Sequence, residues 1–590
     1  MTITKIITII ITLEVMMKKN SKFVAAVLMA ASASFLLTGC HAKGSLSSPV
    51  TEDSSSQVTY NSAPLLDSQK LLETGMPVSI SSTDPANFGF KTAISINNLI
   101  VPNYLDTNAP TFDDGKYTDL TGIITFRGNN YRSNPVFGTA SITEKKFDTK
   151  NSWKNKTGKL KKTVKDGYWT GSCWTGQPLI MKWDDSVRMN MTAMYTNKQN
   201  KDGLVEVIYA TADGHVYFYD IDDGKPTRDP IALGFPIKGT GSIYPDGTPL
   251  YFVGAGDSMG NDCAKAFVIN LMTNEIIYTY GENDVFSDRT DNNAFTAWDS
   301  SPLIDVETDT LIQPGENGIL YLTKLNTSWD GTTVSINPDS PIKWRYSTER
   351  SRNGLKDSTY WLGMESSAVA WKNYLYIADN CGDLFCLDLN TLNVIWSCDT
   401  KDDTNCSPVL EEDPVAGTAY IYISTSLHWT ADDTSHGSIP LMKINAATGE
   451  IIWQRDYNCF TVSGVSGGVQ STALLGQNSL KDIVYFTVAR TGGDTAGKIV
   501  ALNKTDGSIV WSIDMSDYTW SSPIAIYDEA GNGYVVISDS SGNMYLLDGL
   551  TGKEYDSYYL KDNVEASPAA YENTIVVGTR GKKIYGVKVK

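Results

Sequence analysis

The sequence predicts an all-β protein: an eight-bladed β-propeller of four-stranded antiparallel blades, closed by an N-terminal outer strand. A motif of strand, polar turn and strand recurs along the chain, and its period lies in the range of propeller repeats. Short strands of alternating pattern are separated by glycine-containing turns, as in hairpins. The 590 residues include 48 Gly, 31 Tyr and 14 Trp, which favours short strands and tight turns over helices.

The repeated motif places Asp or Asn near the end of one strand and, in its fullest copies, Trp in the next. These fullest copies are residues 386–396, 443–453 and 501–511. Weaker copies are residues 219–224, 268–278 and 547–552. The six copies predict a series of equivalent hairpins rather than a set of unrelated domains.

A second marker, a pair of small polar residues that Pro often follows, precedes the alternating apolar strands. It occurs at residues 176–178, 241–242, 300–302, 366–367, 406–408, 471–472, 521–523 and 566–568. One marker and one hairpin motif account for about four strands, so the markers predict eight blades. A row of open sheets would expose its edges, whereas radial closure protects them.

Closure of the ring is expected to join the two ends of the propeller. The last unit stops at Lys590 without an outer strand, while residues 152–154 look like an outer strand ahead of the first marker. We therefore expect this N-terminal strand, which contains Trp153, to complete the eighth blade.

The N-terminus carries a predicted export signal. Basic residues at 18–22 precede an apolar stretch, residues 23–36, that is too short to span a bilayer comfortably. The Leu-Thr-Gly-Cys sequence that ends at Cys40 resembles the lipobox of bacterial lipoproteins, which implies cleavage before Cys40 and lipidation of its thiol. We expect a leader over 1–39 with its true start at Met16 or Met17, a Ser/Thr-rich tether over 40–69, a lead-in over 70–148 and the propeller over 149–590.

Charge and cysteine usage exclude several classes of protein. The net charge of −18 disfavours binding to nucleic-acid phosphates. The seven cysteines after Cys40 show no Cys-x-x-Cys spacing, which argues against a zinc ribbon or attached haem. Four of them fall between residues 381 and 406, where either a disulfide or buried thiols would fit: Cys381, Cys386, Cys398 and Cys406.

One large aromatic residue stands at the same place in most repeats. An aromatic ring at that position is expected to fill the wedge between neighbouring blades, burying about 150–250 Å². The residues predicted to do so are Trp153, Tyr278, Trp344, Trp396, Trp453 and Trp511.

The pattern carried most fully by residues 501–511 resembles the tryptophan-docking repeat of the pyrroloquinoline-quinone (PQQ) family of eight-bladed propellers. Residues 126–129, Phe-Arg-Gly-Asn, are similar to a lead-in found before many such propellers. The resemblance covers residues 120–590, although Leu392 stands where Gly is usual. It implies either a quinoprotein dehydrogenase, which holds PQQ and calcium on the axis, or a non-catalytic member that uses the propeller for docking.

The quinoprotein alternative, an oxidoreductase dependent on PQQ and calcium, lacks sequence support. The family's enzymes typically carry adjacent cysteines over the cofactor, and this chain has no Cys-Cys pair. Oxygen ligands for calcium are available at Asp299, Glu365, Asn405 and Glu565, but none matches the family's motifs. We therefore expect no cofactor.

The hairpin of the fifth unit is lengthened by an insertion over residues 424–440. Its His428, Asp432, Asp433 and His436 could bind a divalent metal, which would suit a metal-assisted enzyme acting on polysaccharides. A solvated polar loop explains the same residues, and we favour it. We recognise no nucleophile elbow of the hydrolase type and expect no serine hydrolase.

Aromatic residues gather in the loops before the markers and in the insertions that should share their face of the propeller. Such a rim suits sugars or extended peptides, although some members could be core residues. The candidates are Trp169, Trp174, Trp298, Trp361, Trp429, Arg490 and Trp520. We predict an extracytoplasmic, membrane-anchored lipoprotein that serves as a binding or scaffold module for an envelope protein or glycan.

Overall fold

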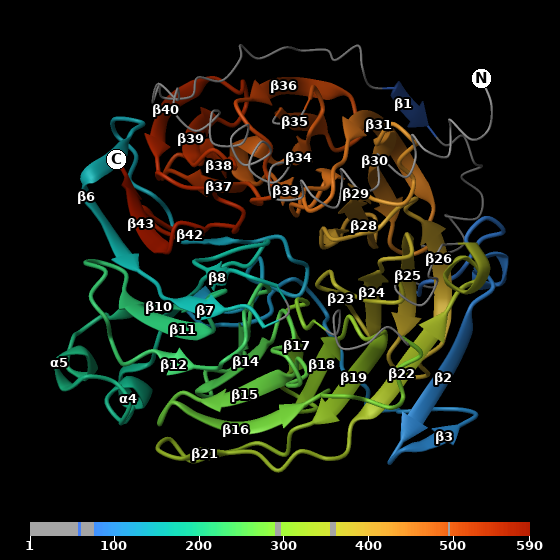
Figure 1. The fold of residues 1–590 in the computed structure, drawn as a ribbon, viewed down its shortest axis with the longest axis horizontal. Coiled ribbons are helices and arrows are strands. Elements are labelled where there is room, and N and C mark those ends of the chain that lie inside the picture. The colour runs from blue at the N-terminus through green and yellow to red at the C-terminus, as the bar shows by residue number, and fades with distance from the viewer. Residues whose placement is uncertain (1–56, 61–75, 164, 290–296, 355–360, 494–495) are drawn as a thin grey trace, which may run out of the picture. The chain divides into compact units, whose positions relative to one another are not determined.

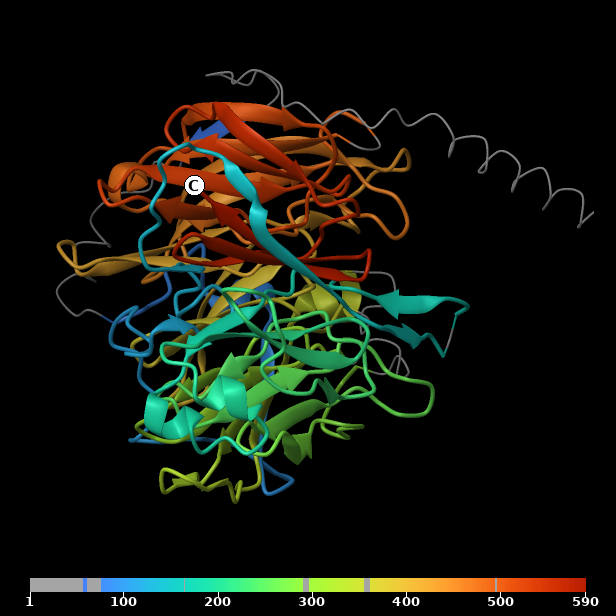
Figure 2. The same ribbon diagram turned by 90° about the vertical axis from the view of Figure 1, so that its left-hand side faces the viewer.

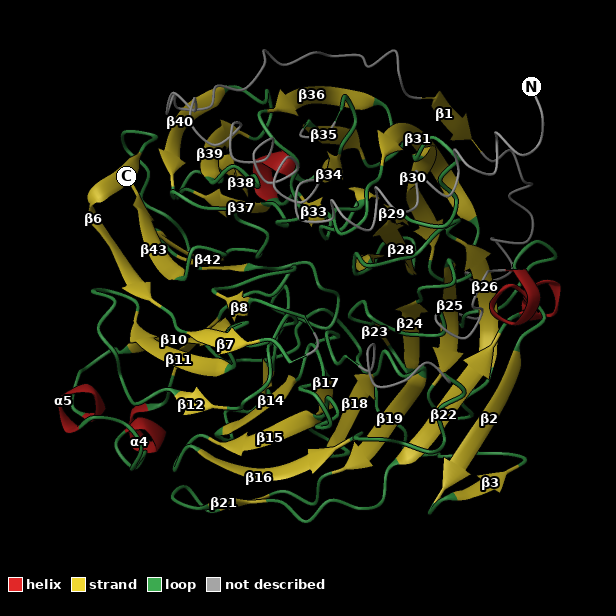
Figure 3. Ribbon diagram, viewed as in Figure 1, coloured by secondary structure: helices red, strands yellow, loops and turns green. Residues whose placement is uncertain are grey.

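The computed structural model describes residues 57–60, 76–163, 165–289, 297–354, 361–493 and 496–590, all within the compact unit 45–590. Eight antiparallel sheets follow one another around a common centre, which confirms the predicted eight-bladed propeller (Figure 1). Helices are few and short among the described residues, as Figure 3 shows. They are η1 (Pro85–Phe88), α4 (Asp185–Arg188), α5 (Thr196–Gln199), η2 (Arg350–Gly354) and η3 (Asn478–Leu480).

The first four blades run from the innermost strand to the outermost in chain order. Blade 1 comprises β9 (Leu179–Lys182), β10 (Val205–Ala210), β11 (His215–Asp220) and β12 (Ile231–Ala232). Blade 2 comprises β13 (Ser242–Ile243), β14 (Leu250–Gly254), β15 (Ala266–Asn270) and β16 (Glu275–Tyr280). Blade 3 comprises β17 (Leu303–Asp305), β18 (Thr310–Pro314), β19 (Ile319–Lys324) and β22 (Ile342–Ser347). Blade 4 comprises β23 (Val369–Trp371), β24 (Tyr374–Ala378), β25 (Asp383–Asp388) and β26 (Val394–Asp399).

The other four blades complete the ring. Blade 5 comprises β27 (Val409–Asp413), β28 (Thr418–Ile423), β30 (His436–Asn445) and β31 (Ile451–Phe460). Blade 6 comprises β29 (Ser426–Leu427), β32 (Gly467–Gly468), β33 (Leu474–Leu475), β34 (Ile483–Ala489), β35 (Gly497–Asn503) and β36 (Ile509–Met515). Blade 7 comprises β37 (Ile524–Tyr527), β38 (Gly533–Ser538), β39 (Asn543–Asp548) and β40 (Glu554–Tyr559). Blade 8 comprises β41 (Ala569–Tyr571), β42 (Thr574–Thr579), β43 (Lys583–Val589) and β6 (Phe147–Lys156).

Blade 8 combines strands from both ends of the propeller region. Its outer strand β6 pairs antiparallel with the last strand of the chain, β43, and Trp153 lies opposite Gly586. The register continues from Lys583 opposite Lys156 to Val589 opposite Phe147. The strand that contains Trp153 therefore occupies the outer position that the C-terminal hairpin leaves open.

Several blades carry additional strands or hairpins from the N-terminal part of the chain. The hairpin of β2 (Lys91–Ile96) and β3 (Leu99–Val101) extends the outer edge of blade 3, and β1 (Gln57–Tyr60) pairs with β31 of blade 5. Two hairpins stand apart from the blades, β7 (Lys159–Lys161) with β8 (Tyr168–Thr170) and β20 (Ser328–Trp329) with β21 (Val334–Ser335). The β7–β8 hairpin projects from one face of the ring, on the right in Figure 2.

Residues 122–137, which we call the axial segment, contact all eight blades. Its ends pair with innermost strands: β4 (Gly122–Ile123) with β9 of blade 1, and β5 (Val136–Phe137) with β41 of blade 8. Between them, hydrogen bonds join Ile124 O to Ile243 N (2.8 Å), Arg132 Nη2 to Ser301 O (2.8 Å), Asn130 O to Ala370 N (3.0 Å), Tyr131 O to Leu410 N (3.0 Å), Arg127 Nη2 to Ala473 O (3.1 Å) and Arg127 Nη1 to Pro523 O (2.8 Å). These residues belong to blades 2 to 7 in turn.

The small polar markers form a belt of hydrogen bonds around the axial segment. The backbone N–H of one marker donates to the side-chain hydroxyl of the marker in the next blade. The pairs are Ser301 to Ser367 (2.9 Å), Ser367 to Ser407 (2.9 Å), Ser407 to Thr472 (3.4 Å), Thr472 to Ser522 (2.9 Å) and Ser522 to Ser567 (3.2 Å). Small hydroxyl residues thus recur because each satisfies a buried backbone donor of its neighbour.

The Trp and Gly of the repeat meet across four of the blade interfaces. Nε1 of Trp396, in blade 4, donates to the carbonyl oxygen of Ala446 in blade 5 at 3.0 Å. Gly449 of the same turn has φ +73°, and a Cβ there would lie 2.6 Å from the Trp396 ring. The same pairing joins Trp153 to Gly224, Trp453 to Gly507 and Trp511 to Gly552. The aromatic residue and the glycine are therefore two halves of one interblade contact.

Blade 4 shows what happens where the repeat departs from this pattern. Leu392 replaces the usual Gly, keeps a positive φ of 55°, and packs into the same buried cluster as Trp344 of blade 3. Nε1 of Trp344 has no hydrogen-bond acceptor among the described residues. Tyr278, the residue predicted for blade 2, is partly buried and packs against Tyr280.

All seven described cysteines are buried free thiols, which settles the alternative left open for residues 381–406. Burial raises the pKa values of Cys381, Cys386, Cys398 and Cys406, to about 12 for Cys398 and Cys406. Within the described ranges no helix is long and apolar enough to cross a membrane. The predicted leader and Cys40 lie outside those ranges.

Candidate functional site

The centre of the ring holds a narrow polar cavity above the axial segment. Phe126 of that segment lines it, together with Trp174, Asp299, Glu365 and Asn405 from the loops that precede the markers. The space open to the centre of a water-sized sphere is about 10 Å³, which is room for about one water molecule. The side chains that line this central cavity therefore almost fill it.

A partly buried lysine, Lys238, is surrounded by carboxylates beside this cavity. Nζ of Lys238 lies 3.8 Å from Oδ2 of Asp299. Burial opposes the charged form of Lys238, but Asp299, Glu316 and Asp257 outweigh it and raise its pKa. Burial also raises the pKa of Asp299 to about 7. Lys238 thus supplies a positive charge next to the oxygen atoms that the sequence suggested as calcium ligands.

PQQ does not fit this centre. A cavity with room for about one water molecule cannot take a three-ring quinone, and the described thiols near it are single and free. Asp299, Glu365 and Asn405 do line the cavity, but Lys238 already balances the charge of Asp299. The residues present therefore do not support a step that passes through a quinone cofactor.

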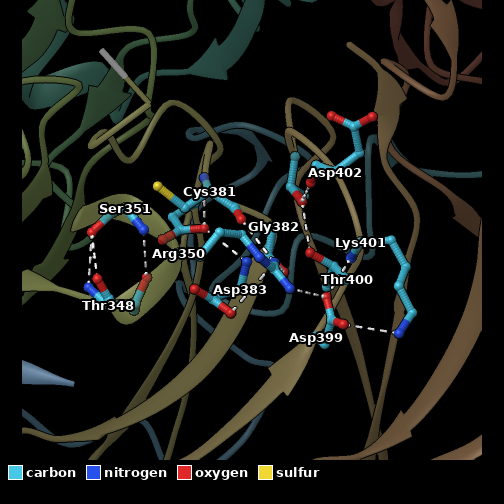
Figure 4. A network of polar contacts seen from close by, with 12 residues as sticks. Thr348, Arg350, Ser351, Cys381, Gly382, Asp383, Asp399, Thr400, Lys401 and Asp402 are labelled. Atoms are coloured by element: carbon cyan, nitrogen blue, oxygen red, sulfur yellow. Dashed lines mark hydrogen bonds and ion pairs between the residues drawn. The ribbon is translucent and has the colours of Figure 1, made fainter. Parts of the chain in front are cut away.

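The blade-five insertion is anchored by Asp402, in the loop that leads out of blade 4. The Asp402 carboxylate accepts hydrogen bonds from the backbone N–H groups of His428 (3.0 Å), Trp429 (3.2 Å) and Thr430 (3.1 Å). Figure 4 shows the base of this loop, where Nη2 of Arg350 lies 2.9 Å from Oδ1 of Asp399. The start of the insertion is therefore held firmly against blade 4.

His428 lies between an acid and a hydroxyl group. Its Nδ1 is hydrogen-bonded to Oδ2 of Asp403, and its Nε2 is hydrogen-bonded to Oγ of Ser466, in the turn before β32. Burial opposes protonation of His428, but Asp403 and then Asp402 outweigh it and raise the pKa of the imidazole. The ring of Trp361 lies 5.7 Å from the imidazole ring, centre to centre.

Four of the aromatic residues predicted for the rim are partly exposed. Trp169, in β8, and Trp174 are partly exposed, and Nζ of Lys238 lies 5.5 Å from the centre of the Trp174 ring. Trp361 and Trp429 are partly exposed beside the blade-five insertion. Nε1 of Trp429 donates to the carbonyl oxygen of Asn380 at 3.3 Å.

Three other rim candidates are buried. Trp298 is 1% exposed and packs between Tyr280 and Tyr321 in the core, so it cannot reach a ligand. Trp520 packs against Trp174, and its Nε1 donates to the carbonyl oxygen of Ser466 at 3.3 Å. Arg490 packs over the Phe460 ring and lines a groove described next.

The residues predicted to bind metal separate into two places. His428 faces Asp403 and Ser466, whereas His436 packs against Phe460, with ring centres 4.9 Å apart. Within the described ranges, no group of three or more His, Cys, Asp or Glu side chains could hold a metal ion. Asp432, His436 and Arg490 instead line an open groove of about 700 Å³ between blades 5 and 6. Asp433 is exposed in the turn between Asp432 and His436.

Asp403 and Ser466 are not among the residues that the sequence predicts for a site. One signal was available, because residues 464–468 read Gly-Val-Ser-Gly-Gly and so have the Gly-x-Ser-x-Gly spacing of a nucleophile elbow. Ser466 here follows a tight turn closed by Val462 and Val465 and leads into a strand. The strand-to-helix context of an elbow is therefore absent, although the serine meets a histidine.

Comparison with known proteins agrees with the repeat. Residues 330–517 and 495–590 match the family model described as outer membrane protein assembly factor BamB. Similar solved structures include BamB from Moraxella catarrhalis, with 14% identity over 65% of this chain and 92% of that chain and a TM-score of 0.41. Quinohemoprotein alcohol dehydrogenase from Comamonas testosteroni has 12% identity over 80% and 82% of the two chains and a TM-score of 0.37. No curated protein sequence matches the chain.

The fold and its interblade contacts define an eight-bladed β-propeller whose centre is occupied by the axial segment. The repeats are similar to those of PQQ-like β-propellers, and residues 330–590 match a family model of that kind.

Proposed function

We propose that this protein is a lipid-anchored extracytoplasmic module whose propeller binds or scaffolds an envelope partner, a protein or a glycan. The observation that carries the proposal is the contrast between the small central cavity, with room for about one water molecule, and the open groove of about 700 Å³ between blades 5 and 6. The match to a family described as an outer membrane assembly factor supports a scaffold role in the envelope.

The groove between blades 5 and 6 is the binding surface we favour. It combines a carboxylate, an imidazole and a guanidinium with the Phe460 ring, a mixture that suits polar partners with an apolar anchor. A photo-crosslinking amino acid at His436 should capture an envelope protein that mass spectrometry identifies. The same residue at Tyr559, exposed on the outer edge of blade 7, is the matched control. Equal capture at both positions would contradict the assignment of the groove.

Anchoring is tested separately through Cys40. Cys40→Ser should prevent lipidation and release the protein from membranes in a soluble fraction, whereas the wild-type chain sediments with them. Retention of the Cys40→Ser variant on membranes would contradict the lipoprotein assignment.

Glycan binding is tested by co-sedimentation with cell-wall polymers. Trp429→Ala should weaken this binding about tenfold while the melting temperature is unchanged.

A further inference from the structure

Asp403, His428 and Ser466 come from three separate loops of the same face. Asp403 lies between β26 and β27, His428 follows β29, and Ser466 precedes β32. The hydrogen bonds of the imidazole order them as carboxylate, Nδ1, Nε2 and hydroxyl. This is the order of acid, base and nucleophile in a serine hydrolase, and such triads recur on unrelated folds.

The carboxylate is held in the orientation that this role requires. Asp403 accepts hydrogen bonds from Nδ2 of Asn380 at 2.6 Å and from Nδ2 of Asn405 at 2.8 Å. The side chain of Ser426 donates to its backbone carbonyl oxygen at 2.8 Å. A fixed carboxylate on Nδ1 keeps the proton there, which leaves Nε2 free to accept the proton of Ser466.

We propose that Ser466 is a nucleophile, activated by His428 and Asp403, that cleaves carboxylic esters of small acyl groups. The imidazole side chain is 26% exposed, so a substrate can approach it, whereas Ser466 is only 9% exposed. The ring of Trp361 lies 5.7 Å from the imidazole, centre to centre, and Nε1 of Trp520 donates to the carbonyl oxygen of Ser466 at 3.3 Å. With a nearly buried serine between these rings, we expect esters of small acyl groups such as acetyl to react faster than esters of long acyl chains. The proposal goes beyond the binding role above and does not depend on it.

The reaction would proceed in two balanced halves. Oγ of Ser466 forms a bond to the ester carbonyl carbon while its proton passes to Nε2 of His428. The carbon–oxygen bond to the alcohol then breaks, and the alcohol leaves with that proton. Water attacks the acyl-serine in the same way, giving its proton to Nε2, and Ser466 regains a proton as the carboxylic acid leaves.

The direct test is covalent labelling of the full-length protein. A fluorophosphonate probe should add to Ser466, where peptide mass spectrometry locates the adduct. Labelling of wild-type protein does not depend on the folding of a variant. The absence of any adduct at Ser466 under conditions that label a known serine hydrolase would overturn the proposal.

Variants connect the label to the three residues. Ser466→Ala should abolish labelling, and His428→Gln or Asp403→Asn should slow it and p-nitrophenyl acetate hydrolysis by about 10³-fold or more. Ser463→Ala, an exposed serine in the same turn, is the matched control and should behave as wild type. Hydrolysis of p-nitrophenyl octanoate should be much slower than that of the acetate. Full labelling in His428→Gln with an unchanged melting temperature would show that the histidine does not activate the serine.

Discussion

At the scale of the residue, the blade interfaces depend on a glycine and a tryptophan that face each other. The turn glycines adopt positive φ values, which L-residues with a Cβ adopt at a cost, and a Cβ at any of these positions would lie less than 3 Å from the indole ring of the preceding blade. The indole N–H donates to a carbonyl oxygen of the same turn. Packing and hydrogen bonding are thus combined in one contact that repeats around the ring.

Gly507→Ala should destabilise the protein more than the backbone conformation alone explains. The φ of +71° costs an alanine about 1–2 kcal/mol, and its Cβ would lie 2.9 Å from the Trp453 ring, which adds about 1–3 kcal/mol. Gly417→Ala, with φ +66° and open space around the new Cβ, is the matched control for the backbone cost. Equal losses in urea unfolding would contradict the steric argument.

Trp396→Phe should cost about 1 kcal/mol more than Trp344→Phe. Both side chains are fully buried at the same place in the repeat, but only Trp396 donates a hydrogen bond, to Ala446 O. Trp344 has no acceptor in the described structure, so its replacement removes volume alone. Chemical unfolding of both variants gives the comparison, and a larger loss for Trp344→Phe would contradict it.

Asp299 should make stability depend on pH. Its pKa is raised to about 7 by burial, above its value in the unfolded chain, near 4. A carboxyl group raised in this way stabilises the fold below the unfolded pKa, and that stabilisation is lost as the pH rises towards 7. Asp299→Asn should therefore flatten the fall in unfolding free energy between pH 4 and 7. A variant that retains the slope of the wild type would exclude Asp299 as its cause.

At the scale of the element, the axial segment acts as a hub that the blades share. Its two arginines are fully buried and donate to backbone carbonyl oxygen atoms of blades 3, 4, 6 and 7. Burial lowers the pKa of Arg127 to about 9 and that of Arg132 to about 10. A short segment without regular structure is therefore fixed by partners that lie far from it along the chain.

Arg127→Met should test this hub. Methionine fills similar volume but leaves the carbonyl oxygen atoms of Ala473 and Pro523 without their donors, a loss of about 2–4 kcal/mol. The melting temperature should fall accordingly. Lys116→Ala, in an exposed part of the same lead-in, should leave it unchanged. An Arg127→Met variant as stable as the wild type would show that blades 6 and 7 do not need the segment.

The repeats explain why the blades could be predicted and the axial segment could not. Hairpins leave a local signal of alternation, turn glycine and outer-strand Trp, so their number follows from the sequence. Arg127 instead donates a hydrogen bond to Pro523, 396 positions away, and no local periodicity indicates such a contact.

The same reasoning applies to the candidate site. Asp403 and Ser466 contact His428 only because neighbouring blades bring three loops together. Trp298 shows the converse, since an aromatic residue before a marker can equally belong to the core.

At the scale of the whole molecule, blade 8 ties the first strand of the propeller region to the last. Backbone pairing joins β6 to β43 along most of their length, and Lys588 N donates to Ser152 Oγ at 2.9 Å. Blade 8 also receives β5 of the axial segment. Blade 8 therefore combines strands from both ends of the propeller region.

Removal of residues 583–590 should destabilise the entire propeller. The truncation deletes β43, which lies between β42 and β6 and has no substitute. We expect a melting temperature at least about 10 °C lower and a loss of the single cooperative transition. Removal of residues 1–40 is the control and should leave the transition unchanged. A cooperative transition at the wild-type temperature after the C-terminal deletion would contradict the closing role of β43.

The pairing of β6 with β43 also determines when the propeller can close during synthesis and folding. Strand β6 emerges from the ribosome before any blade exists, while its partner β43 emerges only after the strands of blades 1 to 7. The two are separated by more than 400 residues, so the pairing forms late and slowly. Until then β6 presents an open strand edge that a chaperone must shield from other nascent chains. A stop codon only a few residues early would thus leave a full-sized protein permanently in its most aggregation-prone state.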